Sequence, residues 1–240
     1  MHRLATTPGG WTPDTEGVIF IEQTPAPIIF LTAADTDIQC LAHVMAHPPA
    51  GLPAVRVVNL LQLQQQLTID TYGEQVLCHA QVIVLRLLGG RGYWSYGLEV
   101  TAAIAAETGA ALIVLPGDDR PDPDLISHST VGLGVANQLW RYLTEGGVEN
   151  LRHGLQYLCD RCLKTPFHPP APQPVPRIGR YAHPSLQVPV TSVGRVGLLF
   201  YRAHYLAANT APIEALCRSL IKRDLRSEEH TSELQSPMYL

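Results

Sequence analysis

Residues 82–99 of this 240-residue chain read VIVLRLLGGRGYWSYGLE. The stretch opens with an apolar run in which Arg86 is the single polar residue, and two glycines follow. From Ser95 the apolar residues recur at helical spacing. A short, continuous apolar run is typical of a strand that is covered on both faces of a parallel sheet. The stretch therefore predicts a buried strand, a loop over residues 89–94 and a helix over residues 95–108.

The same order of strand and helix occurs on both sides of this stretch. Apolar runs that we expect to be strands lie at residues 28–32, 55–61 and 111–115, and segments of helical period lie at residues 35–45 and 68–79. Asp35 and Ser95 stand where helix N-caps are expected, and Gly109 stands where a helix would end. Strands and helices that alternate at this length predict an α/β fold. We expect a doubly wound, mostly parallel sheet of the Rossmann or flavodoxin type, with helices on both faces.

The pattern changes after the fourth expected strand. Two added helices are predicted over residues 125–142 and 148–163, separated at Gly146 and Gly147. Prolines then dominate the sequence up to residue 189, which predicts an extended linker because proline removes backbone donors and favours extended conformers. Beyond it, a strand at 195–201 and a helix at 210–223 indicate the first βα unit of a second α/β domain.

The chain is therefore expected to have four parts. These are an N-terminal α/β head domain over residues 1–164, a Pro-rich linker over 165–190, the start of a second, truncated α/β domain over 191–225, and a tail over 226–240. The tail reads RSEEHTSELQSPMYL, which is polar and has no period that would pack. We expect it to be foreign sequence, disordered or weakly helical, and leave it out of the functional reasoning; the alternative is a natural polar tail.

Composition narrows the class of protein. Apolar residues make up 46% of the chain and charged residues 16%, which is typical of a globular protein with much interior strand. A formal net charge of −4 provides no basic field for nucleic acid or an anionic membrane, so neither is expected as a partner. The N-terminal sequence MHRLATTPGGW lacks the features of a signal peptide, and we expect a cytoplasmic protein. The five cysteines are irregularly spaced and do not predict a disulfide framework.

Candidate binding residues follow two of the expected strands. Arg86, Arg91 and Trp94 belong to the end of the strand near residue 85 and its loop, and Arg202 and His204 follow the strand near residue 198. Ligands of open α/β sheets lie at the carboxyl ends of the strands. Arginine can bind a carboxylate through two parallel hydrogen bonds and a flat aromatic can cover a ring, as a polycarboxylated macrocycle would require. The alternative is a turn whose aromatics pack on the neighbouring helix and whose arginines pair with local carboxylates.

Other motifs point to chemistry less strongly. Residues 116–124, PGDDRPDPD, hold four aspartates that a hard cation such as magnesium would favour, but Asp124 is more simply the cap of the next helix. Cys159 and Cys162 form a single CxxC without a second pair, which favours a buried helical face over a zinc site. The chain contains no phosphate-binding loop, GxGxxG or GxSxG motif. Nucleotide hydrolysis is therefore expected elsewhere.

Longer blocks of the chain resemble the large subunit of aerobic cobaltochelatase, a relative of the magnesium chelatase large subunit. They include EGVIFIEQTPAPIIFLTAADTDIQ, VIVLRLLGGRGYWSYGLE and ALIVLPGDDRPDPDLISHST, and VGLLFYRAHYLAANTAPIEALC is similar to the opening of that family's next domain. The likeness covers nearly all of residues 1–225. It departs at Ala208, where the family usually has glycine, so a tight backbone conformation before Asn209 is in question. The family protein is several times longer.

The resemblance implies a function for the whole family protein. It implies ATP-dependent insertion of Co²⁺ into hydrogenobyrinic acid a,c-diamide during aerobic cobalamin synthesis, with the metal as substrate. The partners implied are an AAA+ ATPase subunit, which uses ATP and Mg²⁺, and that ATPase's own partner subunit. No cofactor is expected on this N-terminal fragment, which we expect to be inactive alone. Its catalytic residues are unknown from the sequence.

Two roles for the fragment follow from this resemblance. In the first, the head domain helps to bind the tetrapyrrole through Arg86, Arg91, Trp94, Arg202 and His204. In the second, these residues are structural and the domain docks the ATPase subunits without a part in catalysis. A fragment of a magnesium chelatase large subunit is a further alternative.

Overall fold

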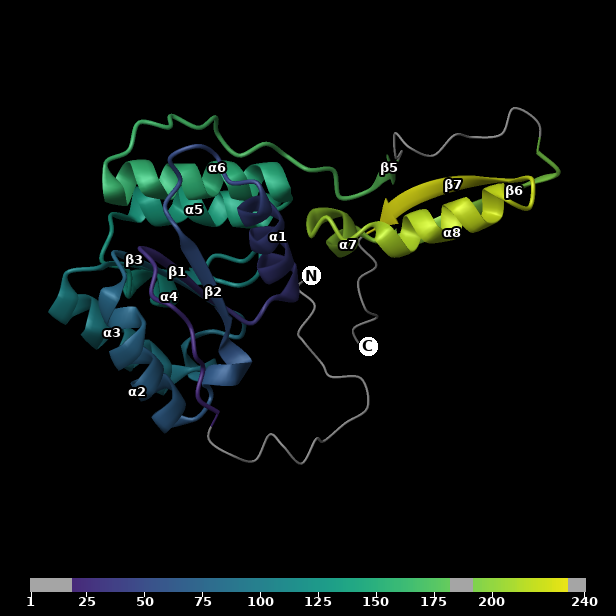
Figure 1. The fold of residues 1–240 in the computed structure, drawn as a ribbon. Coiled ribbons are helices and arrows are strands. Elements are labelled where there is room, and N and C mark those ends of the chain that lie inside the picture. The colour runs from purple at the N-terminus through teal and green to yellow at the C-terminus, as the bar shows by residue number, and fades with distance from the viewer. Residues whose placement is uncertain (1–18, 182–191, 233–240) are drawn as a thin grey trace.

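The described residues up to 164, which we call the head unit, are built on a parallel sheet (Figure 1). The computed structural model describes residues 19–181 and 192–232. Within them four parallel strands occur in the order β2-β1-β3-β4. Their bounds are β1 Ile28–Thr32, β2 Val55–Asn59, β3 Val82–Leu87 and β4 Ala111–Pro116. This order is the flavodoxin-like one, whose topological switch point lies between β1 and β3.

Helices cover both faces of this sheet, as predicted. On one face, Ile29, Leu31, Ile83 and Leu85 join a core with α2 (Gln66–Gln75) and α3 (Ser95–Thr108). On the other face, the alternate strand residues pack on α1 (Asp35–Ala46), α5 (Leu133–Glu145) and α6 (Val148–Leu158). Both faces of β1, β3 and β4 are thus buried, which explains why their sequences are almost continuously apolar rather than alternating, whereas the edge strand β2 is only partly buried.

Several helix ends differ from the prediction. The N-cap positions of α1 and α3 are Ala34 and Trp94, so Asp35 and Ser95 are the first helical residues and not the caps. Gly109 does end α3, in the left-handed conformation at φ 76°. Short 3₁₀ turns occupy Leu60–Leu63 and Leu77–His79, where a strand end and a helix end had been expected.

The helix predicted over residues 125–142 is interrupted. The structure has α4 at Pro123–Ser127 and α5 only from Leu133. Between them the chain runs beside the edge strand β4, where the Thr130 hydroxyl accepts a hydrogen bond from the Leu112 amide at 2.8 Å and the Ser129 hydroxyl accepts one from the Val114 amide at 2.9 Å. These hydrogen bonds pair main-chain groups at the edge of β4, which favours the break over one continuous helix.

The second added helix ends in an unusual turn. After α6, Cys159–Leu163 forms a π-helix, and Lys164 closes it at φ 61°. Gly146 and Gly147, at φ 70° and 85°, separate α5 from α6 as expected. Residues 165–177 then run extended along α5 and α6 (Figure 1). The division of the chain into domains stays a prediction.

A smaller C-terminal unit follows. It consists of β5 Gly179–Tyr181, β6 Gly194–Tyr201, α7 Arg202–Leu206, α8 Ala211–Ile221 and β7 Leu225–Ser232. Its sheet has the order β5-β7-β6, with β6 and β7 parallel across α8. Phe200, Ile213 and Cys217 form its small core. The predicted strand and helix are both present, and Figure 1 shows α7 next to α1 while α8 and its sheet project away from the head unit.

The tail prediction was wrong for part of its length. Residues 226–232 were expected to be disordered or weakly helical, but they belong to β7, which pairs in parallel with β6 from Gly194↔Leu225 to Tyr201↔Ser232. Parallel pairing uses main-chain groups, so a polar sequence can complete the free edge of β6. The foreign origin of this segment stays a prediction, and residues 233–240 lie outside the described part of the chain.

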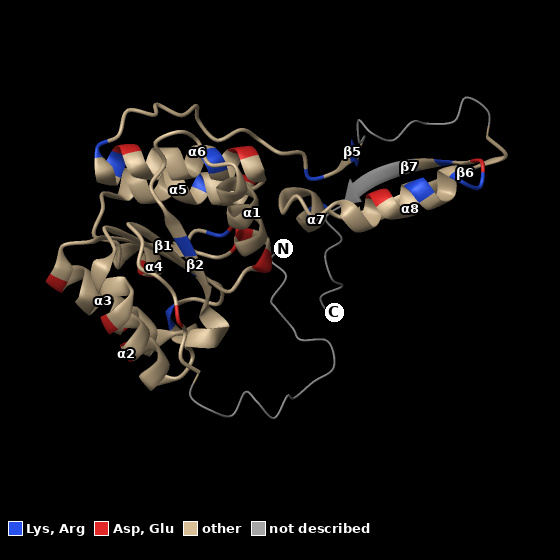
Figure 2. Ribbon diagram, in the orientation of Figure 1, with Lys and Arg blue, Asp and Glu red and all other residues tan. Residues whose placement is uncertain are grey.

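The helices differ in their charged residues. Figure 2 shows Lys and Arg together with Asp and Glu on α6 and α8, whereas α1, α2 and α3 carry Asp and Glu alone among charged residues. Of the helices in the described ranges, none combines the length and the apolar character needed to cross a membrane.

Candidate functional site

The candidate site lies at the carboxyl edge of the head sheet. β1 and β3 diverge there into α1 and into the loop before α3, which is the switch point where ligands of this fold bind. Arg86 is the last residue but one of β3 and pairs in register with Thr32 of β1. The strand order therefore places the predicted arginine at the expected crevice.

A buried ion pair fills this crevice. Arg86 is only 2% exposed, and its Nη1 donates to Oδ1 of Asp37 in α1 at 2.5 Å. The Thr32 hydroxyl donates to the other Asp37 oxygen at 3.0 Å and accepts a hydrogen bond from the Ala34 amide at 3.2 Å. Arg86 also donates through Nε to the Pro116 carbonyl at 3.4 Å. Arg86 thus ties the ends of three strands together and does not present its charge to solvent.

Trp94 is also part of the interior. Its side chain is 5% exposed, and the indole N–H donates to the Leu63 carbonyl at 3.0 Å. A Cβ at Gly97 would lie 2.0 Å from the indole ring, so the glycine one helical turn later makes room for it. The aromatic thus fixes the loop between β3 and α3 against the turn after β2.

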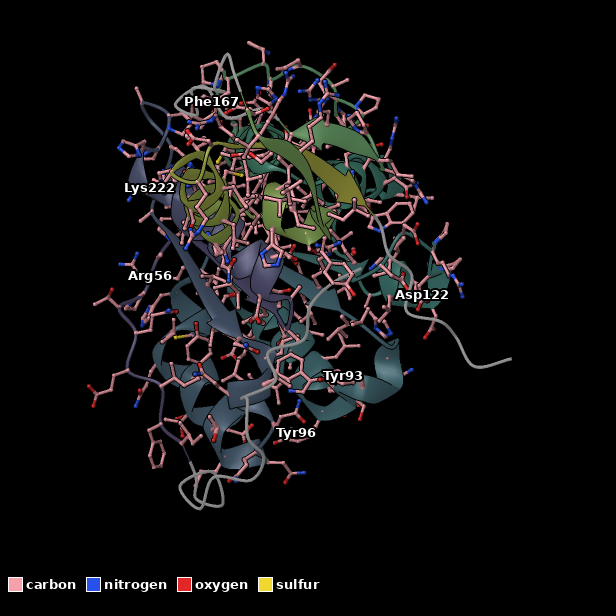
Figure 3. The ribbon with its side chains drawn as sticks, turned by 90° about the vertical axis from the view of Figure 1, so that its right-hand side faces the viewer. Arg56, Tyr93, Tyr96, Asp122, Phe167 and Lys222 are labelled. Carbon is pink, nitrogen blue, oxygen red and sulfur yellow. The ribbon has the colours of Figure 1, made fainter. Side chains whose placement is uncertain are left out.

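The exposed face of the same loop carries Arg91 and Tyr93, and Tyr96 follows in the first turn of α3. The Arg91 side chain is 50% exposed, with Nη2 at 3.8 Å from Oε1 of Glu99, a distance typical of a weak surface pair. Tyr93 and Tyr96 are exposed and project from the same end of the head unit in Figure 3. The Tyr96 phenol donates to Asp70, and this hydrogen bond raises its pKa.

Arg202 is buried at the junction with the C-terminal unit. Its guanidinium donates to the carbonyls of Val175 at 2.8 Å, Pro176 at 3.0 Å and Glu145 at 3.2 Å. Glu145 is the last residue of α5, so a cation here also complements the negative end of that helix. Arg202 therefore joins α7, α5 and the extended segment.

His204 is half-buried on α7, whose end has a Schellman motif. The Asn209 amide donates to the His204 carbonyl at 2.8 Å and the Ala208 amide donates to the Tyr205 carbonyl at 3.1 Å. Ala208 adopts φ 54°, the left-handed conformation that glycine favours at this position. The tight turn that the sequence put in question is thus present, with alanine in it.

The five predicted residues do not converge on one pocket. Arg86, Arg91 and Trp94 share the β3 end and its loop, but only Arg91 is exposed, whereas Arg202 and His204 belong to α7, which packs on α1 and on the end of α5. The sequence reasoning missed Asp37. An arginine inside an apolar strand needs a carboxylate partner, and this rule directs attention to an aspartate just after the neighbouring strand β1.

The acidic loop after β4 serves as a turn and a cap. Asp122, and not Asp124 as predicted, caps α4, because its Oδ1 accepts a hydrogen bond from the Leu125 amide at 3.1 Å. The Asp118 carboxylate accepts one from the Arg120 amide at 3.2 Å. Across the described residues, no three His, Cys, Asp or Glu side chains gather in a way that could hold a metal ion.

The two cysteines of the CxxC lie on a helical face, as predicted. Cys159 is fully buried, and burial together with the Asp160 charge raises the pKa of its thiol to about 11. Cys162 is partly buried and its pKa is also raised by burial. Both thiols are therefore protonated near neutral pH, which argues against a reactive pair.

Comparisons with known proteins agree on one family. Residues 140–232 match the family model described as CobN/Magnesium Chelatase. The chain is 41% identical over 233 residues to the aerobic cobaltochelatase subunit CobN of Pseudomonas aeruginosa, covering 94% of this chain and 18% of that protein. It is 35% identical to the same subunit from Sinorhizobium sp, covering 95% of this chain and 19% of that protein.

A solved structure shares the fold. The catalytic subunit of cobaltochelatase from Mycobacterium tuberculosis superposes with a TM-score of 0.68 at 30% identity, over 88% of this chain and 16% of that one. The chain thus spans less than a fifth of the length of the curated relatives it matches. With 41% identity that extends over both the head unit and the C-terminal unit, the chain belongs to the CobN/magnesium chelatase family.

Proposed function

We propose that this chain is the head region of the porphyrinoid-binding subunit of an ATP-dependent cobaltochelatase. The reaction would be insertion of Co²⁺ into hydrogenobyrinic acid a,c-diamide in aerobic cobalamin synthesis. The observation that carries the proposal is the 41% identity to an aerobic cobaltochelatase subunit over 94% of the chain. The 30% identity to a cobaltochelatase catalytic subunit with the same fold supports it.

The head region would bind and orient, and would not insert the metal. Metal insertion requires bases that remove two pyrrolic protons and ligands that deliver a desolvated cation. The described residues hold no group of three metal-ligating side chains. We therefore assign these steps to the rest of the longer family protein and expect this chain alone to be inactive as a chelatase.

The energy source would be a partner. No phosphate-binding loop occurs in the sequence, so ATP and Mg²⁺ would be used by an AAA+ ATPase subunit that works with its own partner subunit. In this proposal the ATP-dependent enzyme is the assembled chelatase and not the present chain alone.

The exposed loop between β3 and α3 is the part of the head suited to the macrocycle. Arg91 can donate two parallel hydrogen bonds to a peripheral carboxylate, and the Tyr93 ring is partly exposed beside it. Arg86 and Trp94, which were predicted to touch the substrate, are buried, and we propose that they position this loop. Arg202 would hold α7, and with it His204, in place.

A second candidate is a docking role without tetrapyrrole binding. The burial of Arg86, Trp94 and Arg202 favours it, because three of the five predicted binding residues are satisfied inside the protein. In that role the head would present its surface to the ATPase subunits, and Arg91 would be an ordinary surface residue.

Binding of the macrocycle separates the two candidates. We would titrate hydrogenobyrinic acid a,c-diamide into the chain and follow its visible absorption, with Arg91→Ala as the test and Arg152→Ala on α6 as the matched surface control. A charge-assisted bidentate contact predicts about tenfold weaker binding for Arg91→Ala and unchanged binding for Arg152→Ala. No saturable binding to the folded wild-type chain would overturn the substrate-binding proposal and favour the docking role.

A further inference from the structure

In the Pro-rich segment after the π-helix, burial recurs at every third residue from Pro169 to Val175. We call residues 165–177 the strap; it lies along α5 and α6 in Figure 1. Its middle reads PPAPQPVP from Pro169 to Pro176. Pro172 is buried and Pro169 and Val175 are half-buried, while the residues between them are exposed. One side of the strap, at a spacing of three, therefore faces the helices.

The carbonyl groups of the strap follow the same spacing. The Tyr142 hydroxyl of α5 donates to the Pro170 carbonyl. Asn150 of α6 donates through Nδ2 to the Gln173 carbonyl at 2.8 Å. Arg202 of α7 donates through Nε to the Pro176 carbonyl at 3.0 Å. The three bonded carbonyls are thus three residues apart, and each accepts a hydrogen bond from a side chain of a different helix.

The few amides of the strap are bound as well. The Gln173 amide donates to Oδ1 of Asn150 at 2.8 Å, so the Asn150 side chain pairs with both main-chain groups of Gln173. The Val175 amide donates to Oε2 of Glu145 at 3.2 Å. Side chains of the helices therefore bind the strap through both its amide and its carbonyl groups.

Both ends of the strap are fastened. At its start, the Asp160 carboxylate accepts hydrogen bonds from the Phe167 amide at 2.8 Å and from the His168 amide at 2.7 Å. Near its end, Arg202 binds the carbonyls of Val175 and Pro176 and is itself the first residue of α7, directly after β6. The strap thus connects the end of α6 to the start of the C-terminal unit.

A period of three is the signature of a polyproline II helix. That helix has three residues per turn, rises about 3.1 Å per residue and makes no internal hydrogen bonds, so its carbonyls are free for a partner. Six steps from Pro170 to Pro176 therefore span about 19 Å. An α-helix of the 13 residues of α5 is about 20 Å long, so the section of the strap from Pro170 to Pro176 would be about as long as that helix.

We propose that the face made by α5, α6 and α7 is a polyproline II recognition surface whose occupant is this chain's own strap. Its occupation fixes the C-terminal unit on the head unit, because Arg202 binds the strap and begins α7. The proposal concerns neither substrate nor metal and stands apart from the proposed function. Tyr142, Asn150 and Arg202 are positioning residues in it.

The first test uses two prolines of the same strap. Pro172→Asp would put a carboxylate on the buried side, whereas Pro174→Asp would put it on the exposed side, and both variants lose one proline. We expect amide hydrogen exchange at Gln173 and Val175 to be at least tenfold faster in Pro172→Asp and to change by less than about twofold in Pro174→Asp. Equal effects of the two changes would overturn face-specific recognition.

A milder pair of variants keeps the test decisive if Pro172→Asp does not fold. Tyr142→Phe removes only the hydroxyl that donates to Pro170, and Tyr157→Phe makes the same change to the neighbouring ring of α6. Loss of one hydrogen bond predicts about fivefold faster exchange at Gln173 for Tyr142→Phe and wild-type exchange for Tyr157→Phe. Wild-type exchange in both variants would overturn the proposal.

Placement of the C-terminal unit is measured separately, on the full 240-residue chain. Small-angle X-ray scattering should give a larger radius of gyration for Pro172→Asp than for the wild type, and an unchanged value for Pro174→Asp. Far-UV circular dichroism would establish that each variant is folded. A strap that is released without any change in the radius of gyration would refute its role in placing the unit.

Discussion

Removal of the Arg86 guanidinium should destabilise the head unit severely. Arg86→Ala leaves the Asp37 carboxylate buried without its cation, while the hydrogen bond from the Thr32 hydroxyl remains. Breaking a buried ion pair on one side costs about 3–5 kcal/mol of unfolding free energy, a large part of the 5–15 kcal/mol typical of a domain. With a urea m-value of about 2 kcal/mol/M, the midpoint of unfolding should fall by roughly 2 M.

Urea unfolding followed by far-UV circular dichroism measures this loss. Arg91→Ala is the matched control, since this exposed arginine of the adjoining loop should change stability by less than about 0.5 kcal/mol. The double change Arg86→Met with Asp37→Leu should regain most of the stability, because an apolar pair leaves no buried charge. Equal midpoints for Arg86→Ala and Arg91→Ala would refute the structural role of Arg86.

Three further perturbations follow from the structure. Gly97→Ala should lower stability by about 1–3 kcal/mol in thermal unfolding, because the new methyl group collides with the Trp94 indole. Ala208→Gly should raise stability by about 0.5–1 kcal/mol in urea unfolding, since it relieves the left-handed strain at φ 54°. Burial alone would raise the pKa of Asp160, but hydrogen bonds from the amides of Phe167 and His168 outweigh it and lower the pKa. The ionised carboxylate therefore holds the start of the strap at any pH above the ordinary pKa of aspartate. The strap start should loosen only as the pH falls below that ordinary value, with NMR shifts of the Phe167 amide changing there and Asp160→Asn showing no such titration.

The head sheet was predictable because its signal is local. A strand covered on both faces is apolar at most positions, and the runs at the four strands have this property in the sequence itself. Gly109 marks the end of α3 because glycine alone adopts the left-handed cap at little cost. Confirmed elements are thus those whose cause lies within a few neighbouring residues.

The elements that were wrong depend on contacts between distant residues. The break between α4 and α5 exists because Ser129 and Thr130 bind the edge of β4, and nothing within residues 125–142 indicates that edge. β7 forms on a polar sequence because β6 provides a free main-chain edge. Neither contact has a signature in the local hydropathy pattern.

The positions of the candidate residues in the fold were predictable from the sequence, but the internal contacts of the buried ones were not. The strand order puts Arg86 at the switch point, yet the partner that buries it, Asp37, lies 49 residues away in sequence. Trp94 has the same aromatic character whether it covers a ligand or a core, and only Gly97 beside it indicates which. Arg202 was assigned to substrate from its place after a strand, whereas it binds carbonyls of the strap.

Amide hydrogen exchange with and without saturating hydrogenobyrinic acid a,c-diamide tests the central claim most directly. If the head region binds the macrocycle through its exposed loop, the macrocycle should slow exchange within residues 89–99, and this slowing should be lost in Arg91→Ala. The strap amides at Gln173 and Val175 should exchange at the same rate in both states. Protection elsewhere in the chain would contradict binding through this loop, and no protection on a folded chain would contradict the claim and assign tetrapyrrole binding to another part of the family protein.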